Sequence, residues 1–122
     1  MSEKKKTIAN QLAARGNLFV AFDPRREGVV VPDHLRHTHL VKLLVGLNLY
    51  PAIEDLRVND YGISGTLSFS GQPFHCTVPW TSVYGLVSED NSRGKLFEED
   101  YPDELFKAVD VETRRAAFRV VR

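Results

Sequence analysis

Short apolar segments separated by turn residues run through most of this chain, and they constrain its fold more than any other feature. Between residues 17 and 97, runs rich in β-branched and aromatic residues alternate with clusters of Gly, Pro, Asn, Asp and Ser. The turn clusters recur about every 8–12 residues, a spacing typical of short antiparallel strands that follow one another along the chain. The pattern predicts a mainly β domain, built as a small meandering barrel or a curled sheet.

The apolar segments can be placed by residue number. They lie at 18–22, 29–31, 40–49, 53–58, 63–69, 74–78, 83–87 and 95–97. The compositions of 59–62 and 70–73 predict turns, and the break in the pattern at 79–82 suits one helical turn. We therefore expect one β-fold over residues 17–97.

The N-terminal residues have a different period. Residues 3–15 are expected to form a short helix, with Ser2 as its N-cap and Gly16 just past its end. Ile8 and Leu12 lie four residues apart and form a narrow apolar stripe. Because an isolated helix of this length is marginal in water, the stripe needs a partner, either the body of the domain or a second copy of the helix.

Charge and composition limit the classes of protein to which the chain can belong. Sixteen Lys and Arg residues balance sixteen Asp and Glu residues, which weighs against nucleic acid as a partner because binders of phosphate usually have a basic excess. No apolar run approaches the roughly 20 residues that span a bilayer, and no secretory signal follows the N-terminal lysines. With a single cysteine, these features predict one cytoplasmic domain.

Two groups of residues carry metal-binding or nucleophilic side chains. His34, His37 and His39 lie close together in the sequence, but their spacing matches no established metal site. Cys76 follows His75 directly, and adjacent strand residues point to opposite faces, so a structural thiol is favoured over a nucleophile. The sequence has no phosphate-binding loop and no nucleophile elbow. We expect no metal, no cofactor and no catalytic residue, and hence a protein that is not an enzyme.

Trp80 and the pair Arg25 and Arg26 each admit two interpretations. Trp80 is either an exposed recognition aromatic or a plug for one end of the barrel. Arg25 and Arg26 could contact an anion, but neighbouring acidic residues cancel their field, which favours a solvated turn.

One face of the 63–69 segment is a candidate peptide-binding surface. Ser64, Thr66 and Ser68 alternate with apolar residues and carry short side chains. Short side chains leave the backbone of a strand accessible to an extended peptide that lies alongside it. The alternative is an ordinary solvent-facing surface, as in most antiparallel sheets.

The C-terminal region has its own pattern. Residues 103–115 are either a helix with Leu105, Phe106 and Val109 on one face or an acidic flexible linker. The last residues alternate apolar and basic side chains, unlike the polar ends of most chains. An acidic spacer followed by a short basic and apolar terminus is the arrangement of a tethered peptide ligand.

Four motifs occur in an order that resembles one protein family. They are Gly28-Val29-Val30-Val31-Pro32, Phe69-Ser70-Gly71-Gln72-Pro73, Val78-Pro79 and Ser92-Arg93-Gly94-Lys95-Leu96-Phe97-Glu98. Over about residues 17–99 the chain is similar in these motifs to stringent starvation protein B (SspB). The terminal Ala117-Phe118-Arg119-Val120-Val121-Arg122 is similar to the tail of that family, which has the form Ala-Leu-Arg-Val-Val-Lys.

The resemblance implies a fold and a function. The implied fold is a mainly β, small Sm-like or SH3-like open barrel of short antiparallel strands, with an N-terminal helix and an extended C-terminal tail. The implied function is that of an adaptor for the ClpXP protease. Such adaptors bind the ssrA degradation tag, form homodimers through the N-terminal helix, and tether tagged substrates through tails that dock on the N-terminal domain of the ClpX unfoldase.

The resemblance also assigns roles to residues. Residues 1–99 would form the peptide-binding domain, 100–116 a linker and 117–122 the ClpX-binding motif. The implied peptide contacts are Val31, Pro32, Thr66, Leu67, Ser68, Phe69, Lys95 and Phe97. The implied ClpX contacts are Ala117, Phe118, Arg119, Val120, Val121 and Arg122, and the implied dimer contacts are Ile8 and Leu12.

Two departures and several rival functions accompany the resemblance. The N-terminal helix and the linker segment 102–115 are shorter than is usual in the family. An Sm-like fold would also suit an RNA-binding module, whose affinity would depend strongly on salt. Further alternatives are a peptide-binding scaffold for a different degron and a scaffold whose tail folds back onto its own sheet.

Overall fold

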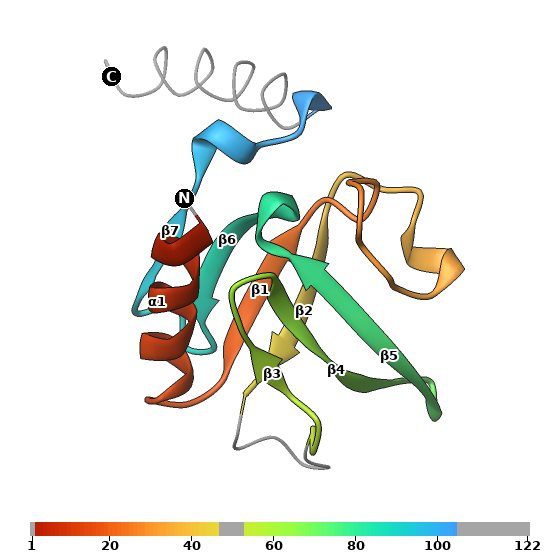
Figure 1. Ribbon diagram of the computed structural model, residues 1–122, viewed down its shortest axis with the longest axis horizontal. Coiled ribbons are helices and arrows are strands. Elements are labelled where there is room, and N and C mark those ends of the chain that lie inside the picture. Colours follow the sequence, from red (N-terminus) through yellow and green to blue (C-terminus); the bar gives the residue numbers. More distant parts are fainter. Residues whose placement is uncertain (1, 47–52, 105–122) are drawn as a thin grey trace, which may run out of the picture.

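The computed structural model describes residues 2–46 and 53–104 as one helix followed by short strands (Figure 1). The helix is α1 (Ser2–Ala13). The strands are β1 (Leu18–Phe22), β2 (Val41–Val45), β3 (Arg57–Val58), β4 (Gly62–Phe69), β5 (Gln72–Pro79), β6 (Val83–Ser88) and β7 (Gly94–Leu96). Three 3₁₀ turns complete the described part: η1 (Asp33–Leu35), η2 (Trp80–Ser82) and η3 (Glu98–Asp100).

The strands form two antiparallel sheets. One has the order β2-β1-β6-β7 and the other the order β3-β4-β5, and η2 connects them by joining β5 to β6. Within the described residues the sheets do not close into a barrel. The predicted mainly β domain with an N-terminal helix is therefore confirmed.

No helix of the described part is long and apolar enough to cross a membrane.

The core lies between the two sheets and is sealed at one end by Trp80. Phe22 of β1 and Val83 and Leu86 of β6 are fully buried. The Trp80 side chain is 2% exposed, and its indole N–H donates to the carbonyl of Asn59 at 2.8 Å. Of the two interpretations of Trp80, the structure supports the plug, because a buried and hydrogen-bonded indole offers no recognition surface.

The helix α1 packs one face against its own domain. Lys5, Ala9 and Leu12 are 3%, 1% and 6% exposed and lie on that face, as expected for positions three or four residues apart. The helix ends at Ala13, slightly earlier than predicted. The body of the domain is thus a partner of the apolar stripe.

Both predicted hairpin turns are present. The Asn59 side-chain oxygen accepts hydrogen bonds from the backbone N–H groups of Tyr61 and Gly62, at 3.0 and 3.2 Å, and so shapes the turn between β3 and β4. Ser70 and Gly71 connect β4 to β5 with φ values of 54° and 83°. Positive φ at both central residues is typical of the tight turn that matches the twist of a two-strand hairpin.

Two predicted strands are shorter than the sequence pattern indicates. In the 53–58 segment only Arg57 and Val58 form a strand, because the preceding residues turn and pack over Gly65 of β4. A side chain at Gly65 would collide with Ile53, so glycine permits this close approach. The 29–31 segment is a loop that makes a single β-bridge, from Val30 to Thr77 on β5.

Candidate peptide-binding site

The inner face of the β4–β5 hairpin is apolar along its length but is not buried along its length. The pair Ile63 and Val78, near the core, is 4% and 3% exposed. Further along, the pair Leu67 and Phe74 is only partly buried and packs against the edge of the core. The hairpin therefore extends its apolar face beyond the core, and an extended peptide could cover that face.

A narrow apolar seam runs between this hairpin and the other sheet. Leu43 of β2, Leu56 and Leu67 form its rim, and Val20 and Cys76 lie deeper. The seam encloses only about 10 Å³ of free space, which is close to the minimum for one water molecule. A bound peptide would therefore lie over the rim rather than insert a side chain into the seam.

Among the described residues the outer edge of β4 has no strand partner after Ser64, because β3 pairs only with Ile63 and Ser64. At the next position along that edge, the backbone N–H of Thr66 donates to the carboxylate of Asp55 at 2.8 Å, and the Thr66 hydroxyl donates to it at 2.7 Å. These bonds from Thr66 hold the pKa of Asp55 down, at about 2. Asp55 thus occupies the position that a further strand would take.

His75 of β5 completes this polar group on the outer face. Its Nδ1 lies 3.2 Å from the Asp55 carboxylate and 3.2 Å from the Thr66 hydroxyl. The three side chains are exposed or half-buried. Sequence reasoning missed Asp55, and the only signal for it was a charged residue within a segment expected to be a strand.

The loop before η1 flanks the same hairpin. Val30 both donates a backbone hydrogen bond to Thr77 and accepts one from it, at 2.9 and 3.0 Å, and so adds to the outer edge of β5. The His34 ring contacts Phe69 edge-on, with the centroids 6.2 Å apart.

Among residues 2–46 and 53–104, no group of three or more His, Cys, Asp or Glu side chains is placed to hold a metal ion. Burial raises the pKa of the Cys76 thiol to about 11.

The structure brings only some of the expected peptide contacts together. Leu67 and Phe69 lie on the inner, apolar face of β4, and Thr66 and Ser68 lie on its other face. Pro32, which is half-buried, belongs to the flanking loop. The four β4 residues thus lie together at one end of the hairpin.

The other expected contacts lie elsewhere or inside the protein. Val31 and Phe97 are 2% and 1% exposed, so their side chains support the core and are not available to a peptide. Lys95 is exposed on β7, at the opposite edge of the other sheet. The sequence motifs that contain these residues did not reveal this, because sequence order does not show which strands are neighbours.

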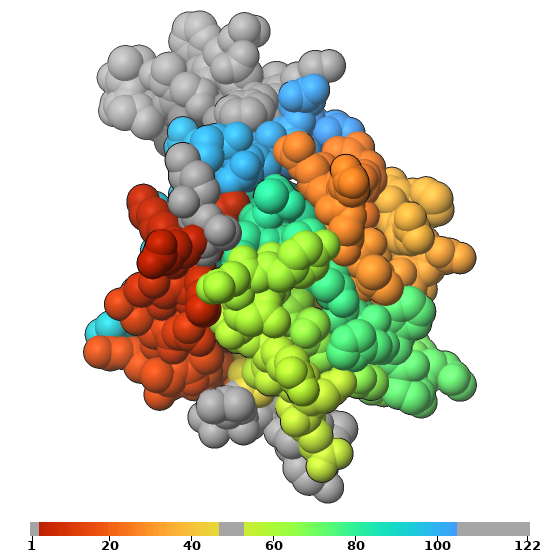
Figure 2. All heavy atoms as spheres, in the orientation of Figure 1, coloured from red at the N-terminus to blue at the C-terminus, as the bar shows by residue number. Residues whose placement is uncertain are grey.

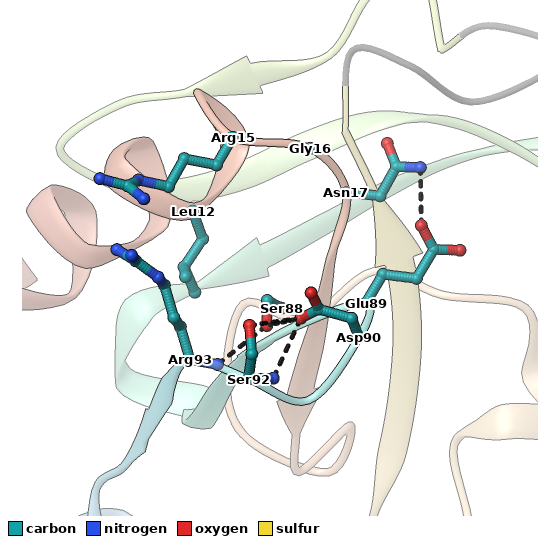
Figure 3. Close-up of a pocket in the computed structure, with 9 residues that line it drawn as sticks. All are labelled: Leu12, Arg15, Gly16, Asn17, Ser88, Glu89, Asp90, Ser92 and Arg93. Atoms are coloured by element: carbon teal, nitrogen blue, oxygen red, sulfur yellow. Dashed lines mark hydrogen bonds between the residues drawn. The ribbon is translucent and has the colours of Figure 1, made fainter.

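A second surface lies at the C-terminal end of α1, where two adjoining clefts of about 450 and 800 Å³ separate it from the β6–β7 turn. Figure 3 shows Arg15 and Arg93 side by side there, while Glu89 points away from them toward Asn17. Asp90 is held by Ser88 and Ser92, as the dashed lines show.

The cations at this second surface have no acidic partner among the residues that the structure describes. Within the part of the chain that the structure describes, no carboxylate lies within ion-pair distance of Arg15, Arg93 or Lys95. Of the expected dimer contacts, Ile8 is partly buried beside these clefts and Leu12 is 6% exposed against its own domain. A second copy of the chain would therefore contact Ile8 more readily than Leu12.

The expected ClpX contacts, residues 117–122, lie outside the described residues, as does the linker from residue 105 onward. A comparison with protein families nevertheless reaches the start of this tail. The family model described as SspB: Stringent starvation protein B matches residues 5–117. No curated protein matches the chain.

Proposed function

The chain belongs to the stringent starvation protein B family, and on that premise we propose that it binds ssrA-type degradation tags and tethers tagged substrates to the ClpXP protease. Membership supports a general role as a protease adaptor, and it is the observation that carries the proposal. The match runs from α1 through both sheets to Ala117, the first residue of the tail motif. The tag, the docking site on ClpX and the dimer are the parts that experiment must test.

The inner face of the β4–β5 hairpin is the surface that best suits the tag. Leu67 and Phe69, with Leu43 across the seam, present a partly exposed apolar strip to an extended peptide. The edge of β4 next to Ser68, which pairs with no strand of the described part, offers backbone groups, so a peptide could add there as a strand. Peptide recognition of this kind combines main-chain hydrogen bonds with pockets for alternate side chains.

Tethering explains how the protein would act without chemistry of its own. A six-residue motif such as residues 117–122 buries little area and binds weakly alone. Two motifs on a homodimer make the second contact intramolecular, and avidity can then rise by about 10²–10⁴. The tagged substrate is held close to the unfoldase, and its apparent KM falls without any change in the catalytic step.

Capture of ClpX by the immobilised full chain tests the tether. Deletion of residues 117–122 should abolish capture, and replacement of those residues by a scrambled sequence of the same composition should abolish it equally. Capture that survives both changes would remove the main support for the adaptor role.

Fluorescence anisotropy with a labelled ssrA peptide tests the tag-binding surface. Leu67→Glu places a charge on the apolar strip and should weaken peptide binding at least tenfold while ClpX capture is retained. Leu96→Glu is the matched control, because Leu96 is an exposed leucine on the distant strand β7. If the wild-type protein gives no anisotropy change at micromolar concentration, the apolar strip binds a different degron.

RNA binding is the second candidate, and it is favoured by Arg15, Arg93 and Lys95, three cations that have no acidic partner in the described part of the chain. It predicts an affinity for single-stranded RNA that falls steeply with salt and is lost in the double variant Arg15→Glu/Arg93→Glu. The adaptor role predicts that this variant binds the ssrA peptide normally.

A further inference from the structure

The acidic segment 98–104 is docked on the domain, although the resemblance assigns residues from 100 onward to the linker. Figure 2 shows it (blue) across the top of the molecule, between the start of α1 and the 23–26 turn. Tyr101 contacts Tyr84 edge-on, with the ring centroids 5.5 Å apart, and Pro102 is buried. We call residues 98–104 the docked acidic segment.

The first attachment of this segment is an ion pair between a buried lysine and a half-buried aspartate. The Lys5 ammonium, whose side chain is 4% exposed, lies 2.5 Å from the Asp100 carboxylate. It also donates to the carbonyls of Trp80 and Val83 at 2.8 and 2.7 Å, and it sits over the Phe97 ring. All three N–H groups of the ammonium are thereby used, so Asp100 is fixed to α1 and to the corner between the sheets.

The second attachment holds the far end of the segment to the 23–26 turn. The guanidinium of Arg25 binds both oxygens of Glu104, with one N–H···O distance of 2.9 Å. Its remaining N–H groups donate to Asp23, whose side chain is 5% exposed, at 2.9 Å. Arg25 is thus oriented by a buried carboxylate and presents a two-pronged donor to Glu104. Arg26 adds a bond from its guanidinium to the Asp100 carbonyl at 3.3 Å.

The two attachments differ in strength. Lys5 and Asp100 are 4% and 31% exposed, whereas Arg25 and Glu104 are 39% and 46% exposed. Exposed ion pairs contribute little and are screened by salt, so the Glu104 end can be released while the Asp100 end stays in place. The other acidic residues of the segment, Glu98, Glu99 and Asp103, make no ion pair within the described residues.

We propose that Lys5 and Arg25 are positioning residues that hold the docked acidic segment and so fix the point at which the C-terminal region leaves the domain. The proposal deepens the tethering role and rests on it for its biological meaning. With both attachments made, the connection to the 117–122 motif is the 12 residues 105–116. Each residue released from the domain adds at most about 3.5 Å to the connection, so the two attachments set how far the motif can extend from the bound substrate.

The exit point can be measured in the isolated full chain. A nitroxide is attached to a cysteine introduced as Ala108→Cys, four residues beyond Glu104, and paramagnetic broadening of the backbone amides is recorded by NMR. Cys76 is 2% exposed and stays unlabelled. In the otherwise unchanged chain, broadening should be strongest for the 23–26 turn.

Variants of the second attachment should move this signal. In Glu104→Gln the broadening at residues 23–26 should fall at least twofold, and in the charge-swapped Arg25→Glu/Glu104→Arg it should return. Asp103→Asn removes the same charge from the neighbouring residue, which makes no ion pair in the described part of the chain, and should change nothing. Equal broadening in Glu104→Gln and Asp103→Asn would overturn the proposal.

ClpXP degradation of a tagged substrate provides the functional readout. Releasing residues 103 and 104 lengthens the linker from 12 to 14 residues, and effective concentration changes with about the −3/2 power of length, so Glu104→Gln should change KM about 1.3-fold at constant kcat. The charge-swapped variant should restore KM. A fall in the broadening at residues 23–26 with an unchanged KM would refute the positioning role. If even the unmodified chain fails to deliver substrate, the tethering function fails while the NMR result stands.

Discussion

The two ends of this small domain carry similar polar groups in different surroundings. At the clamped end, formed by Lys5, Arg25, Asp100 and Glu104, one carboxylate meets an ammonium that is 4% exposed. At the hairpin end, formed by residues 66–75 and Asp55, the carboxylate meets a histidine that is 56% exposed. The Lys5 ammonium is shielded from water and the His75 ring is not, so the two bonds should contribute very differently to stability.

This difference matches what each end is proposed to do. A segment that sets the exit point of a tail must stay in place, and a buried ion pair with its hydrogen bonds satisfied enforces one arrangement. A surface that accepts a peptide must give up its own contacts, and the exposed bonds of Asp55 to the β4 edge cost little to exchange. The comparison predicts that removing Lys5 disrupts the domain, whereas removing Asp55 hardly alters its stability.

The largest expected effect is that of Lys5→Ala. It leaves two carbonyls and the Asp100 carboxylate without their donor, and breaking a buried ion pair by removing one partner costs about 3 kcal/mol. Urea unfolding followed by circular dichroism measures the change. Lys6→Ala is the matched control, because Lys6 pairs with Asp60 at the surface, and it should cost below about 0.5 kcal/mol. Similar losses in the two variants would mean that burial does not distinguish the two ends.

The next effect comes from Gly65→Ala, which tests how the hairpin end holds Asp55. The new methyl group would meet Ile53 and the backbone of Leu56, so the turn that carries Asp55 must move, at a cost of about 1–2 kcal/mol. Gly85→Ala is the control, because its methyl group would meet Ala21 and Leu96, away from the turn that carries Asp55. NMR should show the Thr66 amide shifted in Gly65→Ala alone. An unshifted Thr66 amide would show that Asp55 keeps its place without glycine.

The fold was largely predictable from the sequence because most of its signals are local. Alternation along 63–69, the turn residues at 59–62 and 70–73, and the β-branched runs each reflect a few neighbouring residues. The 53–58 segment was predicted wrongly as a full strand, since its alternation is real but the packing of Ile53 over Gly65 overrides it. Which strands are neighbours was not predictable, and so Lys95 was grouped with β4 although it lies on β7.

The polar groups of both ends were the least predictable part. Lys5 belongs to a run of three lysines that looks uniformly solvated, and only its position one turn before Ala9 places it in the core. Arg25 was expected to lie in a solvated turn, whereas it binds Glu104, 79 residues away in the sequence. Such pairs leave no local pattern, because each partner alone resembles an ordinary surface charge.

Lowering the pH tests one exposed carboxylate at each end, Glu104 and Asp55, because both become protonated. Arg25 lowers the pKa of Glu104 from 4.5 to about 2, and Thr66 lowers that of Asp55 from 3.8 to about 2. Because these pKa values are lower in the folded state, the stability they provide is complete above about pH 4.5 and is lost as the pH falls towards 2. Glu104→Gln and Asp55→Asn should each flatten the fall of Tm over this range by a similar, small amount. A much larger effect of Glu104→Gln would mean that Arg25, rather than Lys5, contributes most to holding the docked acidic segment.

The smallest expected effect is a gain at the tip of the hairpin end. Ser70 has a φ of 54°, which costs free energy for a residue with a β-carbon, and asparagine tolerates this conformation better than serine does. Ser70→Asn should therefore raise the free energy of unfolding by about 0.5 kcal/mol, measured by urea unfolding. The gain should leave ssrA-peptide affinity unchanged, because the tip lies past the apolar strip that ends at Phe69. A loss of affinity would show that the peptide reaches the turn and that the binding surface extends further than the strip formed by Leu67 and Phe69.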